Sequence, residues 1–109
     1  MATKRISKKI IQMVNEYALR LKKEERLPIE RVIIFGSHAK GTAQHWSDID
    51  VCIVSPKFTN LLHSIEFLLV KRNKEEVLAG IEPVGFTRND FNNGGSFIQE
   101  IKKTGIIVH

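Results

Sequence analysis

The stretch FGSHAKGTAQHWSDIDV, from Phe35 to Val51, decides the fold of this chain. Its Gly36-Ser37 pair is followed, after ten residues, by Asp48-Ile-Asp50 at the start of an apolar run. Residues i and i+2 of a β-strand point to the same face, so we expect the two aspartates to lie side by side. Two such carboxylates repel each other unless a cation lies between them. Mg²⁺ suits this position because it takes oxygen ligands and often keeps phosphates in its shell.

The Gly36-Ser37 pair itself predicts a tight turn whose free backbone N–H groups can hold a phosphate. Gly-Ser pairs are also common in ordinary turns, so the pair becomes specific only through its neighbours in the chain. Gly41 allows the backbone a close approach and Lys40 supplies a cation. His38 is open to two interpretations, an exposed loop residue or a contact to phosphate or base. Trp46 is equally open, since it could stack on a base or cover the edge of the core.

Length and composition predict a single domain, residues 1–109, of the globular class. Apolar residues make up 42% of the chain and charged residues 27%, and no apolar run is long enough to span a membrane. Residues 1–9 are basic but precede no apolar signal segment, so we expect a cytoplasmic protein. Cys52 is the single cysteine, which excludes an internal disulfide, and its apolar neighbours predict a buried thiol. The net charge of +5 favours polyanionic partners, although a solvated helix face would explain it equally well.

Apolar periodicity predicts alternating helices and strands and therefore an α/β fold. The strand at 81–86 contains Pro83, which indicates an edge strand or a position near its end. Asn60 or Thr59 could cap the second helix, Gly80 could stop it, and Ser96 could cap the last one. The predicted helices are residues 5–26, 60–78 and 97–104, with a helical turn near 37–40, and the predicted strands are 31–35, 48–54, 81–86 and 106–108.

Glu82 is the candidate for a third acid. It lies in an apolar, strand-like run, where a carboxylate is unfavourable without a partner. If this strand lies beside residues 48–54, Glu82 can join Asp48 and Asp50 around a pair of metal ions; otherwise it is an acid at a strand end facing water. Rival catalytic sets are absent, since the chain has no Gly-x-Ser-x-Gly motif, no Walker loop and no cysteine–histidine cluster for zinc.

The segment from Phe35 to Ala43, continued by Ser47-Asp-Ile-Asp-Val51, closely resembles the nucleotidyltransferase superfamily typified by DNA polymerase β. The length and the later Ile81-Glu-Pro83 segment resemble its smallest members, the minimal nucleotidyltransferases, including the MntA-like antitoxins. The resemblance implies a small mixed sheet with helices packed against it and three catalytic acids, Asp48, Asp50 and Glu82. The third acid is often Asp in the family, so the longer Glu82 could alter the position of the metal.

The same resemblance implies transfer of a nucleoside monophosphate from a nucleoside triphosphate, with ATP expected, to an acceptor hydroxyl. Two Mg²⁺ ions, or Mn²⁺, would be held by the three acids. Gly36 and Ser37 would bind the triphosphate, with Lys40 and Gly41 adding to the loop and Ser47 placing a hydroxyl beside the metals.

The smallest members resemble antitoxins whose partner is a helical HEPN-type toxin, and the implied acceptor is a tyrosine of that toxin, in a homo- or hetero-oligomer. Two alternatives remain open: a non-enzymatic antitoxin that masks its partner by binding, and an enzyme that modifies RNA or tRNA.

Overall fold

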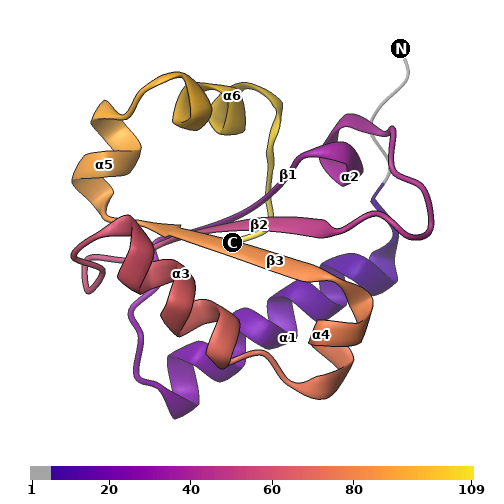
Figure 1. The fold of residues 1–109 in the computed structure, drawn as a ribbon, viewed down its shortest axis with the longest axis horizontal. Helices are drawn as coiled ribbons and strands as arrows, with labels where there is room; N and C mark the ends of the chain where they lie inside the picture. The colour runs from indigo at the N-terminus through magenta and orange to yellow at the C-terminus, as the bar shows by residue number, and fades with distance from the viewer. Residues whose placement is uncertain (1–5) are drawn as a thin grey trace.

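A four-stranded mixed sheet lies between two layers of helices in the computed structural model, which describes residues 6–109 (Figure 1). The strand order is β3-β2-β1-β4. The pair β1–β2 is antiparallel, as is β1–β4, whereas β2 and β3 run parallel. The strands are β1 (Arg31–Phe35), β2 (Ile49–Val54), β3 (Ile81–Phe86) and β4 (Ile106–Ile107). The predicted α/β class and mixed sheet are therefore confirmed.

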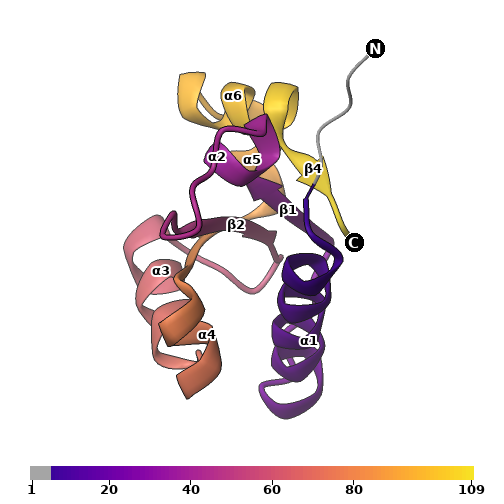
Figure 2. The ribbon, with the colours of Figure 1, turned by 90° about the vertical axis from the view of Figure 1, so that its right-hand side faces the viewer.

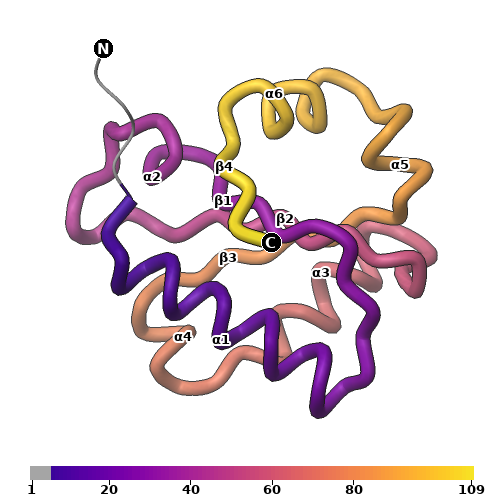
Figure 3. Tube along the Cα trace, turned by 180° about the vertical axis from the view of Figure 1, so that it is seen from behind, coloured from indigo at the N-terminus to yellow at the C-terminus, as the bar shows by residue number. Residues whose placement is uncertain are grey.

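The layer below the sheet contains α1 (Lys8–Glu24), α3 (Leu61–Val70) and α4 (Lys74–Ala79) (Figure 2). Seen from behind, α1 crosses under the sheet next to α4 (Figure 3). The Ser7 side chain caps α1 by accepting a hydrogen bond from the Ile10 N–H. The apolar stripe of α1 buries its side chains against alternate residues of β1 and β2, which form the larger core: Val14, Tyr17, Ala18, Leu21, Val32, Ile34, Val51 and Ile53.

The layer above the sheet contains α5 (Arg88–Asn93) and α6 (Ser96–Thr104), with the one-turn helix α2 (Ser37–Lys40) on the same side (Figure 2). The other alternate residues of the strands form a second core with α6, made of Ile33, Cys52, Val54, Phe86, Ile98 and Ile101. Cys52 is fully buried, which confirms the prediction of a buried thiol. Burial raises the pKa of this thiol to about 12, so the thiol stays protonated and inert.

The predicted helix at 60–78 is wrong as one element, because the chain forms two helices with a break at residues 71–73. Asn73 caps α4 in a reciprocal arrangement: its side chain accepts from the Glu76 N–H, and its own N–H donates to the Glu76 carboxylate, both at 2.8 Å. An Asn followed three residues later by Glu is the sequence signature of this capping box. The predicted cap by Asn60 and the stop at Gly80 are both confirmed.

Other boundaries differ from the prediction by short segments. Residue 5, the predicted start of the first helix, lies outside the described residues, and α1 ends at Glu24, before Pro28. The helix α5 was not predicted; Thr87 caps it by accepting from the Asp90 N–H. Ser96 is the first residue of α6 and provides no side-chain cap, since Gly95 takes the cap position.

The predicted edge position of the strand at 81–86 is confirmed, because β3 lies at one edge of the sheet. Pro83 is therefore tolerated, since a strand pairs on only one side there. Within the described part of the chain, no helix is long and apolar enough to cross a membrane.

Candidate active site

Two of the predicted acids lie directly opposite each other in the sheet. The parallel register of β2 and β3 pairs Asp50 with Glu82, while β1 places Phe35 on the other side of Asp50. Asp48 lies one residue before β2, which begins at Ile49 rather than at residue 48. The neighbouring strand that the prediction for Glu82 requires is therefore present, and the three acids lie at one end of the sheet.

Asp50 lies in an electrostatic environment that disfavours its charge. Its pKa is raised above the usual range, first by burial, then by the negative charges of Asp48 and Glu82. The opposing contribution comes from His38, which lowers the pKa. Asp50 is half-buried, whereas Asp48 and Glu82 are exposed. A cation bound at this position would relieve the repulsion that raises the pKa of Asp50.

Gly36 provides the close approach of backbone to the acids. Its φ of 74° and ψ of −151° belong to a backbone region that residues with a side chain rarely adopt. A Cβ added at this residue would overlap a carboxylate oxygen of Asp50. The glycine is therefore needed both for the backbone conformation and for the space that Asp50 occupies.

The turn after Gly36 is the one-turn helix α2, as the predicted helical turn at 37–40 anticipated. The Lys40 N–H donates to the Gly36 carbonyl, and the Thr42 N–H donates to the Ser37 carbonyl, both at 3.0 Å. Gly41 ends the turn with a left-handed φ of 78°. The first N–H groups of a helix have no partner within it, so Gly36 and Ser37 stand where an anion could be bound beside Asp50.

Lys40 and Ser47 are both engaged in contacts within the protein. The Lys40 ammonium lies 3.3 Å from a carboxylate oxygen of Glu100 in α6, with both side chains about half exposed. The Ser47 hydroxyl accepts a hydrogen bond from the Gln44 N–H at 2.9 Å. Neither arrangement tests the predicted roles, but Lys40 would have to leave Glu100 to reach a phosphate.

His38 connects the start of the loop to its end. Its Nε2 lies 3.4 Å from the Ser47 carbonyl oxygen, and its side chain is half-buried. Two adjoining pockets, of about 220 and 280 Å³, both include His38, His45 and Ile10 in their walls. His38 is therefore part of the folded loop beside Asp50 rather than a free surface residue.

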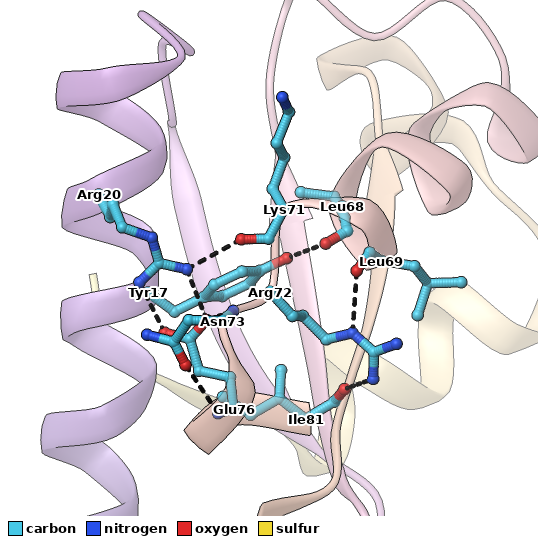
Figure 4. A network of polar contacts seen from close by, with 9 residues as sticks. All are labelled: Tyr17, Arg20, Leu68, Leu69, Lys71, Arg72, Asn73, Glu76 and Ile81. Atoms are coloured by element: carbon cyan, nitrogen blue, oxygen red, sulfur yellow. Dashed lines mark hydrogen bonds and ion pairs between the residues drawn. The ribbon is translucent and has the colours of Figure 1, made fainter. Parts of the chain in front are cut away.

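The start of β3 is held by contacts that the sequence did not reveal. The Ile49 N–H donates to the Gly80 carbonyl at 2.8 Å, and a Cβ on Gly80, whose φ is 86°, would lie 3.1 Å from an Asp48 oxygen. Arg72 donates to the carbonyl of Leu69 at 3.1 Å and to that of Ile81 at 3.0 Å (Figure 4). The helix break thus fixes the strand end that carries Glu82.

A buried polar network anchors the same junction to α1 (Figure 4). Arg20 donates to both carboxylate oxygens of Glu76, at 2.5 and 2.8 Å, and to the Lys71 carbonyl at 2.9 Å. Glu76 is only 2% exposed, and the Tyr17 hydroxyl donates to the Leu68 carbonyl at 2.6 Å. Burial raises the pKa of Tyr17, which keeps this hydroxyl protonated as a donor. These residues support the site from below the sheet without belonging to it.

The donor chemistry of the three acids suits a hard divalent cation. Within residues 6–109, no described cation forms an ion pair with Asp48, Asp50 or Glu82. No three His, Cys, Asp or Glu side chains of the same residues are gathered so that they could hold a metal on their own. Mg²⁺ does not require such a cage, because it is usually held by one or two carboxylates, water and substrate phosphates. The residues present therefore fit Mg²⁺, and the shared ligand set stays a prediction.

Comparison with known proteins shows the family and the fold of the chain. The family model described as nucleotidyltransferase domain matches residues 14–108. A crystal structure of a protein from Sulfolobus solfataricus, provisionally assigned as a nucleotidyltransferase, superposes with a TM-score of 0.65 at 17% identity. The match covers 91% of this chain and 78% of that one, and it shows a shared fold. No curated protein matches the sequence. The chain belongs to the nucleotidyltransferase domain family, consistent with a minimal nucleotidyltransferase of the DNA polymerase β-like superfamily.

Proposed function

We propose that this protein is a metal-dependent transferase that moves AMP from ATP to a hydroxyl group of an acceptor. The acceptor oxygen forms a bond to the α-phosphorus while the bond to the pyrophosphate oxygen breaks, and the hydroxyl proton leaves to solvent. The observation that carries the proposal is the pairing of Asp50 with Glu82 across β2 and β3, with Gly36 packed against Asp50. The acids and the turn at Gly36 and Ser37 are thereby brought to one end of the sheet.

Asp48, Asp50 and Glu82 would hold Mg²⁺, or Mn²⁺ in its place. When bound, the metal lowers the pKa of the attacking hydroxyl and stabilises the charge that develops on pyrophosphate. Gly36 and Ser37 bind the triphosphate through backbone N–H groups. Lys40 adds a positive charge once its ammonium leaves Glu100. Both side chains of this ion pair are exposed, so breaking it costs little free energy.

The acceptor that we propose is a tyrosine of a helical HEPN-type toxin, which would make this protein an antitoxin. The family resemblance supports this choice. Exposed apolar side chains on α3 and α4 offer surface for a protein partner: Leu61, Leu62, Val70, Val77 and Leu78.

The test is incubation of the protein with labelled ATP, Mg²⁺ and the product of the neighbouring gene. We expect label on the partner with the wild type and none with Asp48→Asn or Asp50→Asn. Glu24→Gln is the matched control, since Glu24 is an exposed acid at the end of α1, on the opposite side of the sheet. Mn²⁺ binding, followed by electron paramagnetic resonance, should fall in the aspartate variants and remain unchanged in the control.

Transfer that persists in both aspartate variants would refute the proposed chemistry. Neutralisation of the toxin by the double aspartate variant would instead favour a module that masks its partner by binding.

The net charge of +5 supports a second candidate, transfer to tRNA. Label on tRNA rather than on the protein partner would select it, and tRNA binding should then weaken steeply with salt because phosphate contacts release counterions.

A further inference from the structure

The strand registers arrange side chains in rows on the upper face of the sheet. Because alternate residues of a strand share a face, Phe35, Asp50 and Glu82 form one row across β1, β2 and β3. The next row, two residues away on each strand, contains Ile33, Cys52 and Val84. Neighbouring rows are about 7 Å apart, since a strand rises about 3.4 Å per residue. The surface beside the acids is therefore apolar.

Phe97 of α6 lies over this apolar row. Its ring centroid is 5.7 Å from that of Phe35, in the row of the acids, and 6.2 Å from that of Phe86, at the far end of β3. The Phe35 contact is edge-on, with 79° between the ring planes. Phe97 nevertheless stays 52% exposed, while Ile98 and Ile101 of the same helix are buried. An aromatic ring is thus fixed by two neighbours and left open to solvent beside the acids.

A nucleotide bound through its triphosphate at Gly36 and Ser37 would lie next to Phe35, the residue before Gly36, against whose ring Phe97 packs. The ribose carries the base away from the phosphates, and a base directed along the apolar face would meet the exposed ring of Phe97. Base–aromatic stacking accepts any base, because every base has a π-face. Trp46 is more exposed, at 70%, but its ring contacts His45 within its own loop. A ring that packing already holds in place loses less conformational freedom on binding.

We propose that the exposed ring of Phe97 stacks on the base of the bound nucleoside triphosphate. The proposal rests on the proposed function and adds to it a base-binding residue outside the motif of glycine, serine and acids. Stacking of this kind discriminates weakly among bases, so ATP and GTP should bind with similar affinity at this position.

The experiment measures binding of ATP and of inorganic tripolyphosphate, both with Mg²⁺, by isothermal titration calorimetry. Phe97→Leu removes the ring and keeps an apolar side chain against Phe35, and Phe97→Tyr keeps the ring. Leu19→Ala is the matched control, an apolar residue 49% exposed on α1, below the sheet. We expect Phe97→Leu to weaken ATP binding about 5- to 150-fold, with tripolyphosphate unaffected, and the other two variants to match the wild type.

The comparison of the two ligands separates the ways in which the inference could fail. Unchanged ATP binding by Phe97→Leu would overturn it, and so would an equal loss for both ligands, which would assign the ring to the phosphate loop. Unchanged ATP binding with a raised KM for the acceptor would assign the ring to the acceptor and overturn it as well. A wild type that binds neither ligand would refute the proposed function and this inference together.

Discussion

Replacement of Gly36 by alanine should destabilise the protein through a collision with one identified carboxylate. The added Cβ would overlap an oxygen of Asp50, and the residue would have to keep a φ of 74°. Both effects arise from the position of Gly36 between the end of β1 and the start of α2. The variant therefore tests the geometry that brings the turn at Gly36 and Ser37 against the acids.

The expected cost has two parts of comparable size. A backbone with φ of 74° and ψ of −151° lies in a region that is almost restricted to glycine, and it costs a residue with a side chain about 1–3 kcal/mol. Forcing a methyl group into an occupied space costs typically about 1–3 kcal/mol. The free energy of unfolding should therefore fall by about 2–6 kcal/mol, which for a domain of this size lowers Tm by about 8–24 °C.

Urea denaturation of a double-mutant cycle separates the two parts. In the Asp50→Ala background the carboxylate is gone, so Gly36→Ala should cost only the backbone term, and the coupling should be about 1–3 kcal/mol. Gly80→Ala is the control, because Gly80 also has a positive φ, of 86°. Its added Cβ would lie 3.1 Å from an oxygen of Asp48, a contact that a small rotation of the Asp48 side chain relieves. Equal costs of Gly36→Ala with and without the Asp50 carboxylate would refute the reasoning.

Three further predictions concern individual charges. Arg20→Ala should lower the free energy of unfolding by about 3 kcal/mol in chemical denaturation, because it leaves the buried Glu76 carboxylate unpaired, whereas Lys23→Ala on the same helix should change it little. Asp50→Asn should stabilise the protein at neutral pH, because the fold raises the pKa of the Asp50 carboxyl. The ionised carboxylate therefore begins to destabilise the fold as pH rises above the pKa of the unfolded state, about 4. Below that pH the variant and the wild type should be equally stable. Glu100→Gln should change the free energy of unfolding by less than about 1 kcal/mol, because the ion pair that it breaks is exposed. It should also tighten the binding of tripolyphosphate, because Lys40 is freed. Unchanged binding in calorimetry would contradict the predicted role of Lys40 in phosphate binding.

Local signals in the sequence predicted most of the elements correctly. The strands at 31–35 and 81–86 and the caps at Asn60 and Gly80 depend on residues close to one another along the chain. The division between α3 and α4 was also encoded locally, in the Asn73–Glu76 capping box, and was missed because no glycine or proline separates the two apolar segments on either side of the polar residues 71–76. Periodicity alone does not register a break that one capping residue introduces.

The sequence by itself determined the family and the nature of the acids, because the Gly-Ser pair, its spacing to Asp48 and Asp50, and the apolar strands on either side of that loop are all local patterns. Only the tertiary structure decided that Glu82 lies opposite Asp50, since the register of β2 with β3 depends on pairing segments about thirty residues apart. The same is true of Phe97, Arg72 and the Lys40–Glu100 pair, which reach the site from other elements. A shift of one residue would turn every side chain of β3 to the other face, so the site exists only in the packed sheet.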